Sequence, residues 1–223
     1  MSGTVYLVGA GPGAPDLLTL RAARLLERAD IVFHDALVHP HTVALAVHAI
    51  KVPVGKRCGR HSTAQQFINK RLVDAAAMHE VIVRLKGGDP MLFGRAQEEL
   101  DYLRSHGITV EVVPGVTGMS GCWTRANVPM TWGNDTLAVL PGTLGEEQLV
   151  DRLRHTDAAV IMKVGRNLGK VRRAVEAAGL LSRAVYVERG TMQDERILPL
   201  AECREPVGAY FATVLIPGEG RRL

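Results

Sequence analysis

The sequence predicts an α/β protein made of two successive α/β domains. Short β-branched runs alternate along the chain with segments whose apolar residues recur at helical spacing. Several of these runs stop at glycine, proline or a single polar residue, as strands of open α/β sheets do where they meet a ligand. The composition shifts between Pro114 and Pro129 and a similar alternation follows. We therefore predict one domain over residues 1–114 and another over residues 115–223.

The first domain is expected to open with a βαβ unit. A strand over residues 4–8 leads into a glycine-rich loop, a helix over 20–29 that Thr19 would cap, and a strand over 31–34. The parallel crossover of such a unit is right-handed. The remaining elements of the domain are expected to be helices over 42–50, 65–78 and 96–105, and strands over 50–54, 81–85 and 108–113.

The second domain is expected to continue the alternation. A turn-rich stretch over residues 116–122 becomes helical towards Ala126. The elements predicted beyond it are strands over 136–140, 158–162, 184–188 and 210–217, and helices over 145–154 and 168–178. Strands and helices that alternate in both halves predict mixed α/β layers throughout.

Length and composition limit the class of protein. The chain has 223 residues, of which 47% are hydrophobic, and this suits one or two globular domains. No apolar run approaches the roughly 18 residues of a membrane span, and we expect no cleavable leader because the N-terminus enters a strand directly. The cysteines, Cys58, Cys122 and Cys203, are too few and too scattered for a disulfide framework, and the histidines have no metal-ligand spacing. We expect a cytoplasmic protein without membrane association and without a metal.

Positive charge is concentrated in one segment. Residues 51–95 contain nine basic and three acidic residues, a net charge of +6, whereas the whole chain carries +4. Such a segment favours a polyanionic partner, although an ordinary solvated surface explains it about as well. Only 4% of the residues are aromatic, which argues against the stacking platforms of single-stranded nucleic-acid binders. A basic module that binds RNA therefore remains an alternative that the composition disfavours.

Two glycine-rich loops follow predicted strands. Gly87-Gly88-Asp89-Pro90 ends the run over residues 81–85, and either a tight turn or a ligand loop explains it. Gly9-x-Gly11-x-x-Ala14 matches the dinucleotide fingerprint and leaves an NAD-dependent dehydrogenase as an alternative. Pro12 and Pro15 weaken that match, because each removes a backbone donor that a pyrophosphate would use.

Six predicted strands end in residues that suit a ligand site. These are Gly9 to Gly13, Asp35, Gly87 to Asp89, Thr117, Met162 and Gly190. One such turn carries little weight, but six of them in two successive halves predict a single ligand cleft between the two domains.

The chain resembles the tetrapyrrole (cobalamin and siroheme) methyltransferases along essentially its whole length. The motifs that carry the resemblance are Val8-Gly-Ala-Gly-Pro-Gly13 with Asp16-Leu-Leu-Thr-Leu20, Gly55-Lys-Arg-Cys-Gly59, Gly87-Gly-Asp-Pro-Met-Leu-Phe-Gly-Arg95, Val113-Pro-Gly-Val-Thr117 and Val187-Glu-Arg-Gly-Thr191. The resemblance implies a homodimer of two-domain subunits that binds S-adenosylmethionine between its domains and releases S-adenosylhomocysteine. It also implies a small-molecule tetrapyrrole as the methyl acceptor.

The two halves resemble different branches of this family. Phe33-His-Asp-Ala-Leu-Val38 and Phe93-Gly-Arg-x-x-Glu-Glu99 are similar to uroporphyrinogen-III C-methyltransferases, which make precorrin-2 by way of precorrin-1. Val160-Ile-Met-Lys-Val-Gly-Arg166 and Tyr186-Val-Glu-Arg-Gly-Thr-Met192 are more similar to precorrin-2 C-methyltransferases of the cobalamin pathway. We expect the first activity, in siroheme or cobalamin biosynthesis, because the residues implied in proton handling lie in the first half; the second activity is the alternative.

The resemblance also implies roles for individual residues. Asp35 would accept a proton and Lys56 would donate one, with a turn residue and a surface lysine as the ordinary alternatives. Arg95, with Glu98 beside it, would contact the acceptor, unless the two form only an intrahelical ion pair. The side chains expected to bind substrate carboxylates are Arg57, Arg60 and Arg84. The residues expected to bind S-adenosylmethionine are Pro12, Gly87, Gly88, Asp89, Leu92, Thr117, Gly118, Met162 and Gly190.

Overall fold

The computed structural model describes residues 2–36, 38–54 and 65–219. The chain divides into two compact units, Met1–Gly118 and Met119–Leu223. We call them the first unit and the second unit and describe each by itself. Both contain helices and a five-stranded sheet, so the predicted α/β class is confirmed.

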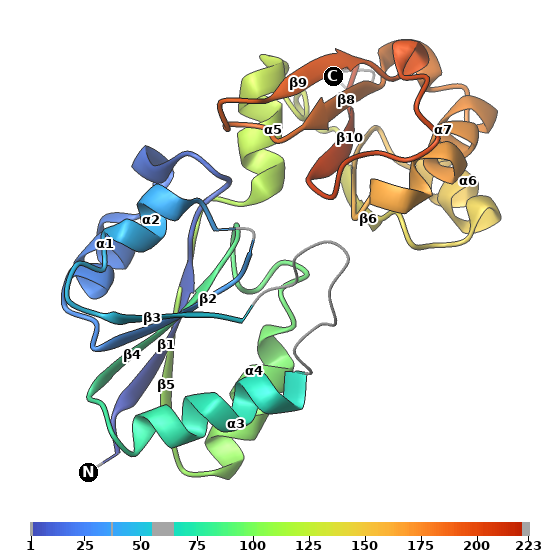
Figure 1. Cartoon of the computed structure of the whole chain (residues 1–223). Coiled ribbons are helices and arrows are strands. Elements are labelled where there is room, and N and C mark those ends of the chain that lie inside the picture. The colour runs from blue at the N-terminus through green and yellow to red at the C-terminus, as the bar shows by residue number, and fades with distance from the viewer. Residues whose placement is uncertain (1, 37, 55–64, 220–223) are drawn as a thin grey trace. The chain divides into compact units, whose positions relative to one another are not determined.

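The sheet of the first unit is entirely parallel (Figure 1). Its strands, in the spatial order β3-β2-β4-β1-β5, are β3 (Ile50–Pro53), β2 (Ile31–His34), β4 (Val81–Lys86), β1 (Thr4–Gly9) and β5 (Thr109–Val113). The predicted βαβ unit is present, but β4 lies between its two strands. Because all five strands run the same way, their carboxyl ends meet at one edge of the sheet.

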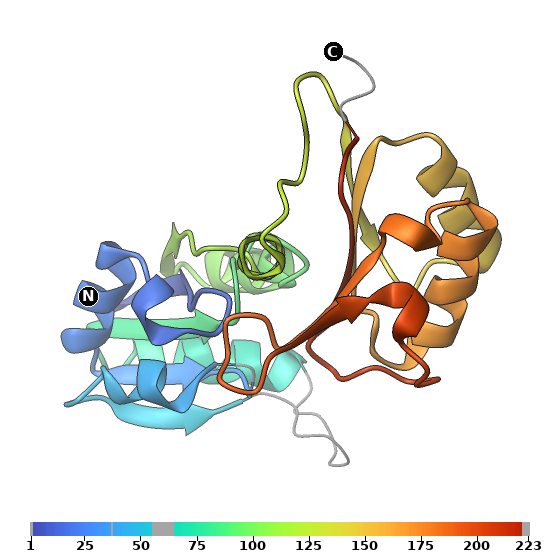
Figure 2. The ribbon, with the colours of Figure 1, turned by 90° about the horizontal axis from the view of Figure 1, so that it is seen from above.

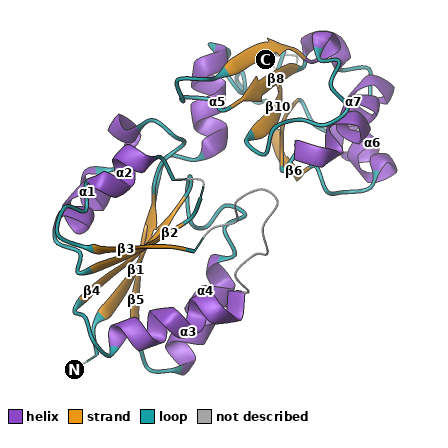
Figure 3. Ribbon diagram, viewed as in Figure 1, coloured by secondary structure: helices purple, strands orange, loops and turns teal. Residues whose placement is uncertain are grey.

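Helices cover both faces of this sheet (Figure 3). On one face α1 (Leu20–Glu27) and α2 (Pro40–Ala44) pack on alternate strand residues that include Val8, Val32 and Leu85. On the other face α3 (Gln65–Ala76) and α4 (Ala96–Ser105) pack on the intervening residues, which include Leu7, Phe33 and Ile82. The central strands β1, β2 and β4 are buried along most of their length, which explains their nearly continuous apolar runs.

Local signals set most of these boundaries. The hydroxyl of Thr19 accepts a hydrogen bond from the N–H of Ala22 at 3.2 Å, so the predicted cap of α1 is confirmed. Helix α4 has the predicted bounds and ends before Gly107, whose φ of 70° favours glycine. Helix α2 is shorter than predicted and begins earlier, because Pro40 occupies its first turn and the ring of His39 accepts the N–H of His41 at 3.1 Å.

The sheet of the second unit is mixed. Its strands, in the spatial order β6-β7-β10-β8-β9, are β6 (Leu137–Pro141), β7 (Ala158–Met162), β10 (Ala212–Ile216), β8 (Val185–Glu188) and β9 (Arg196–Pro199). Only β6 and β7 form a parallel pair of neighbours, and β10 runs antiparallel to both β7 and β8. The sequence did not predict β9, which closes an antiparallel pair with β8.

Three helices flank this second sheet (Figure 2). Helices α6 (Glu146–Arg154) and α7 (Leu168–Ala177) pack with Ile161, Val214 and Ile216 on one face. Helix α5 (Gly118–Ala126) packs through Cys122 and Trp123 on the opposite face, against Val160, Val187 and Leu215. Four one-turn 3-10 helices complete the described structure, at Pro15–Leu17, Gly165–Asn167, Leu181–Arg183 and Leu200–Glu202.

Within the described residues, no helix is both long and apolar enough to cross a bilayer. The same residues contain no group of three or more His, Cys, Asp or Glu side chains arranged to hold a metal ion. Cys122 and Cys203 are both buried free thiols.

Candidate functional site

Three glycines meet at the carboxyl edge of the first sheet, where β1, β4 and β5 end. A Cβ atom on Gly9 would lie 2.6 Å from the Cα of Gly115 and 2.7 Å from the carbonyl oxygen of Gly88. A Cβ atom on Gly115 would collide with the same oxygen of Gly88. No side chain fits between these backbones, so the three loops approach one another as closely as peptide groups allow.

The two glycine-rich loops of the sequence are paired directly. The N–H of Gly88 donates to the carbonyl of Gly11 at 2.7 Å, and the N–H of Gly11 donates back at 3.2 Å. Both residues have positive φ, 68° for Gly88 and 76° for Gly11. A Cβ on Gly88 would also lie 3.3 Å from the N atom of Gly118. The segments that contain Pro12, Gly87 to Asp89, and Thr117 with Gly118 therefore converge.

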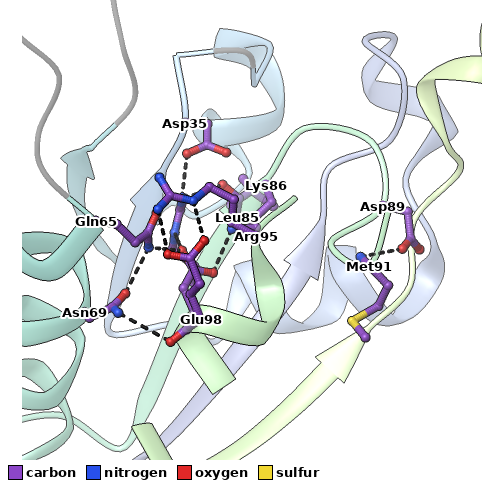
Figure 4. Close-up of polar contacts among 11 residues, drawn as sticks. Asp35, Gln65, Asn69, Leu85, Lys86, Asp89, Met91, Arg95 and Glu98 are labelled. Atoms are coloured by element: carbon purple, nitrogen blue, oxygen red, sulfur yellow. Dashed lines mark hydrogen bonds and ion pairs between the residues drawn. The ribbon is translucent and has the colours of Figure 1, made fainter. Parts of the chain in front are cut away.

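Asp89 holds this arrangement together. Its Oδ2 accepts the N–H of Gly115 at 3.0 Å. Its Oδ1 accepts the N–H of Met91 at 2.8 Å (Figure 4). The carboxylate therefore ties the end of β5 to the loop after β4. Leu92, which is half-buried, continues this loop through its N–H bond to the Asp89 carbonyl at 3.3 Å.

Asp35, the predicted proton acceptor, follows β2 and contacts β4. The Nη2 atom of Arg84 lies 2.6 Å from the Oδ1 of Asp35, and the Asp35 N–H donates to the carbonyl of Leu85 at 3.2 Å. The Arg84 side chain is 3% exposed, whereas that of Asp35 is 23% exposed. Asp35 is thus held from inside the protein and keeps part of its surface open.

Glu99 lies behind this pair and is fully buried. Its Oε1 accepts the Nε of Arg84 at 3.1 Å, and its Oε2 accepts the Nζ of Lys86 at 2.7 Å. Gln65 on α3 also donates to Oε1 at 3.1 Å, and Figure 4 shows these contacts around Gln65, Lys86 and Asp35. We call Asp35, Arg84, Lys86 and Glu99 the ionic cluster; it pairs two carboxylates with two cations.

The charges of the cluster shift the pKa values of its cations. Burial disfavours the charged form of Arg84, but the attraction of Asp35 and Glu99 outweighs burial and raises the pKa of its guanidinium. Burial and, after it, the neighbouring Arg84 charge lower the pKa of the Lys86 ammonium, although Glu99 opposes both. Of the two cations of the cluster, Arg84 therefore keeps its positive charge more strongly than Lys86 does.

These contacts correct the prediction for Arg84. We expected this side chain to bind substrate carboxylates, but it is buried and its Nε, Nη1 and Nη2 atoms bind Glu99, the Leu85 carbonyl and Asp35. The basic segment over residues 51–95 is corrected in part for the same reason, because two of its cations, Arg84 and Lys86, are compensated inside the protein.

Arg95 and Glu98 form a surface ion pair on the first turn of α4. The Nε and Nη2 atoms of Arg95 donate to the two carboxylate oxygens of Glu98 at 2.7 and 2.6 Å, and both side chains are about half exposed. The hydrogen bond with Glu98 raises the pKa of Arg95 and lowers that of Glu98. This is the intrahelical pair foreseen as the alternative to a contact with the acceptor.

Two further predicted residues, Met162 and Gly190, lie in the second unit, each next to unusual backbone. Met162 ends β7 and packs with the apolar group around Trp123. Gly190 follows β8, and a Cβ there would lie 3.0 Å from the Sγ of Cys122 on α5. Lys163, Arg189 and Thr191 adjoin them and have φ of 56°, 51° and 72°. Left-handed backbone in non-glycine residues stores strain and concentrates at ligand sites.

Glu195 fastens the turn that contains Gly190. Its Oε2 accepts the N–H of Thr191 at 3.0 Å, and both of its carboxylate oxygens bind Arg125 of α5. The hydrogen bond from Arg125 lowers the pKa of the Glu195 carboxyl. The strained residues after β8 are therefore held by a charged contact to the same helix that carries Cys122.

Three predicted residues, Lys56, Arg57 and Arg60, lie outside the described residues. The sequence reasoning missed three others, namely Lys86, Glu99 and Glu195. A signal for the first two was present, because Glu99 interrupts the buried stripe of Ala96, Leu100 and Leu103, and because Lys86 alternates with Arg84 along a buried strand. A charge in such a position requires a buried partner.

Comparison with known proteins identifies a family. The model described as Tetrapyrrole (Corrin/Porphyrin) Methylases matches residues 4–203. A precorrin-2 C(20)-methyltransferase from a Sinorhizobium species is 39% identical over 97% of this chain and 96% of that protein. A siroheme synthase from Pseudomonas fluorescens (strain Pf0-1) is 53% identical over 58% of this chain, but the matched part is only 28% of that longer protein.

A solved structure is similar over nearly the whole chain. The uroporphyrin-III C-methyl transferase from Thermus thermophilus, crystallised with S-adenyl homocysteine, gives a TM-score of 0.80 at 36% identity. The match covers 96% of this chain and 97% of that one.

Proposed function

Since the chain belongs to the tetrapyrrole (corrin/porphyrin) methylases, we propose that it methylates uroporphyrinogen III to precorrin-2 by way of precorrin-1. S-adenosylmethionine is the methyl donor. The observation that supports this acceptor most is the Asp35–Arg84 pair at 2.6 Å, which keeps a carboxylate in place at the carboxyl edge of the first sheet. The first-half motifs resemble the uroporphyrinogen branch in the same region.

The residues present fit a bound methyl donor. The backbones of Gly9, Gly88 and Gly115 leave no room for side chains, and a Cβ on Gly118 would meet nothing within 4 Å. Peptide groups in such an edge suit the carboxylate and base of S-adenosylmethionine. When bound, this donor supplies the methyl group as its S–CH₃ bond breaks, a C–CH₃ bond forms on the pyrrole, and the sulfonium becomes the neutral thioether of S-adenosylhomocysteine.

The chain's own residues handle the acceptor. The Asp35 carboxylate takes the proton that the methylated ring loses, and Lys56 donates a proton where the ring requires one. Arg95 exchanges its exposed Glu98 partner for a substrate carboxylate, which costs little because surface ion pairs are weak. Arg57 and Arg60 bind further carboxylates. Pro12, Gly87, Gly88, Thr117, Gly118, Met162 and Gly190 contact the donor, and Asp89 and Leu92 shape its loop.

One observation favours a second candidate. The relative that matches 97% of this chain at 39% identity is a precorrin-2 C(20)-methyltransferase. The second-half motifs resemble the same branch. Precorrin-2 as acceptor is therefore the alternative substrate.

One substrate assay decides between the two. Purified enzyme with S-adenosylmethionine is given uroporphyrinogen III or precorrin-2, and the products are identified by mass and absorption. We expect uroporphyrinogen III to gain two methyl groups. Methylation of precorrin-2 alone would establish the alternative. Tight nicotinamide binding without S-adenosylmethionine binding would revive the dehydrogenase that Gly9-x-Gly11-x-x-Ala14 left open.

We also propose that the enzyme works as a homodimer in the cytoplasm, as the family resemblance implies. Sedimentation equilibrium of the purified chain tests the dimer, and a monomer at micromolar concentration would contradict it. Fractionation of the native host tests the compartment.

A further inference from the structure

The ionic cluster contains a residue with no role so far. Glu99 is 0% exposed and accepts hydrogen bonds from Arg84, Lys86 and Gln65. Burial of a carboxylate costs desolvation free energy, which only charged and hydrogen-bonding partners can offset. The three partners of Glu99 therefore compensate a substantial desolvation cost.

The geometry links Glu99 to Asp35 through one side chain. Arg84 uses its Nε for Glu99 at 3.1 Å and its Nη2 for Asp35 at 2.6 Å. Two separate atoms of a rigid, planar group are thus fixed at once, so the orientation set by Glu99 at one end is transmitted to Asp35 at the other. A third bond, from the Arg84 Nη1 to the Leu85 carbonyl at 3.2 Å, fixes the plane of the guanidinium.

The strand and the helix make this placement specific. Arg84 and Lys86 lie two residues apart on β4 and so point to the same face as Ile82, which packs under α3 and α4. Glu99 points inward from α4 beside Leu100 and Leu103. Gln65 of α3 donates to both Glu99 and Asn69, and Asn69 donates to the Glu98 carbonyl at 3.4 Å. The anchor therefore rests on rigid elements rather than on a loop.

We propose that Glu99 is a positioning residue, which through Arg84 holds the Asp35 carboxylate in the orientation that proton transfer requires. This inference rests on the proposed methylation. Arg84 pairs with both carboxylates of the cluster, and Lys86 supplies the second positive charge through its ion pair with Glu99. Asp35, the partly exposed member of the cluster, is the group that faces the reaction.

A pair of double variants tests the proposal. Lys86→Met/Glu99→Leu, the apolar variant, and Lys86→Met/Glu99→Gln, the amide variant, both remove the buried Lys86–Glu99 charge pair, so neither leaves that lysine without its partner. They differ in polarity, since only the amide variant retains an oxygen that can accept the Arg84 Nε–H and the Gln65 side-chain amide. Asp101→Asn, an exposed change on the same helix, is the control and should keep wild-type kinetics.

We expect kcat to fall by about a hundredfold in the apolar variant and to recover to within about fivefold of wild type in the amide variant. The affinity for S-adenosylhomocysteine, measured by calorimetry, should stay within about twofold in both. Equal kcat values in the two variants would overturn the proposal. A parallel loss of S-adenosylhomocysteine binding would also overturn it, because Glu99 would then support the fold rather than Asp35.

A second readout does not depend on turnover. Nuclear magnetic resonance of the Arg84 Nε–H should show slow exchange with water in wild type and in the amide variant, and fast exchange in the apolar variant. Fast exchange in wild type would disprove the link between Glu99 and Arg84. If wild type methylates no tetrapyrrole, the proposed function fails, and this measurement still decides whether Glu99 holds Arg84.

Discussion

Asp35 differs from the other members of the ionic cluster in its exposure. Its side chain is 23% exposed, while those of Arg84, Lys86 and Glu99 are at most 4% exposed. A carboxylate that must meet a substrate needs an open side, and its orientation is kept by partners on the closed side. This division between a buried support and an open acceptor is the clearest functional feature at the scale of single residues.

Replacement of Asp35 by asparagine should separate proton transfer from binding. In Asp35→Asn the amide oxygen can still accept from Arg84, but the amide takes no proton, so kcat should fall by about 10²–10⁴-fold. Affinity for S-adenosylhomocysteine should not change. Methyl transfer from labelled S-adenosylmethionine to the tetrapyrrole that wild type accepts measures kcat. A loss smaller than about tenfold would show that another group accepts the proton.

Two glycines at the same edge should respond differently to alanine. Gly115→Ala should destabilise the protein by about 1–3 kcal/mol or prevent folding, because its Cβ collides with the carbonyl of Gly88. Gly118→Ala should leave the melting temperature unchanged, since its Cβ meets nothing within 4 Å. Thermal unfolding followed by circular dichroism compares them. Equal melting temperatures would contradict the close packing of the three loops.

Residue types predicted the edge better than they predicted its internal contacts. The sequence identified Gly9, Gly11, Gly87, Gly88 and Asp89 as exceptional, and these loops do converge. It did not reveal that Arg84 faces inward to two carboxylates, because the partners Asp35 and Glu99 are 49 and 15 residues away along the chain. A positive charge in a sequence carries no sign of whether a distant part of the chain will bury it.

At the scale of elements, the first unit was easier to predict than the second. Parallel strands buried on both faces and separated by helices give long, distinct apolar runs, and β4 and α4 have almost the predicted bounds. In the second unit β9 is a short strand of mostly exposed residues at the edge of the sheet. The antiparallel direction of β10 depends on its contacts with β7 and β8, which no local pattern encodes.

The turn after β8 should depend on its contact with α5. Glu195→Ala removes the acceptor of the Thr191 N–H and the partner of Arg125, so the left-handed residues around Gly190 lose their restraint. We expect the dissociation constant for S-adenosylhomocysteine to rise about tenfold, which corresponds to about 1.4 kcal/mol.

A matched control is available within the same unit. Glu146→Ala removes a similar exposed ion pair, the one that joins α6 to Arg173 of α7. It should leave the affinity unchanged. Equal dissociation constants for the two variants, measured by calorimetry, would show that the contacts of Glu195 with Thr191 and Arg125 do not contribute to ligand binding.

At the scale of the whole molecule, stability at alkaline pH should depend on one phenol. Tyr186 is buried on β8, accepts the N–H of Ala209 at 3.3 Å and donates to Glu188 at 3.2 Å. Burial is the main cause that raises the pKa of Tyr186 to about 12, and the neighbouring Glu188 contributes less. The folded state thus retains the phenolic proton more firmly than the unfolded chain, whose tyrosines have a pKa of about 10.

The sign of the effect follows from linkage. The contribution of Tyr186 is complete below about pH 10 and is lost as the pH rises from there through about 12. The melting temperature of wild type should therefore fall more steeply over this window than that of Tyr186→Phe. Exposed Tyr210→Phe is the control and should follow wild type. Parallel curves for wild type and Tyr186→Phe would contradict the expectation.

The two units also differ in how they complete their sheets. The first has a core on each face of a parallel sheet, and the second has a large core under α6 and α7 and a smaller one under α5. The alternation of strands and helices predicted α/β layers in both. It did not predict this asymmetry, because which helix covers which face is decided by packing across the whole unit.

Cys122 lies directly beneath Gly190, and burial raises the pKa of its thiol above the ordinary value. Because the thiol is buried next to this turn and its pKa is raised, we expect an alkylating reagent to reach it only when the turn opens. The rate at which such a reagent alkylates Cys122, followed by peptide mass spectrometry, therefore measures how often this turn opens. A native cysteine thus reports the backbone movement of a strained segment in the second unit, and no engineered probe is needed.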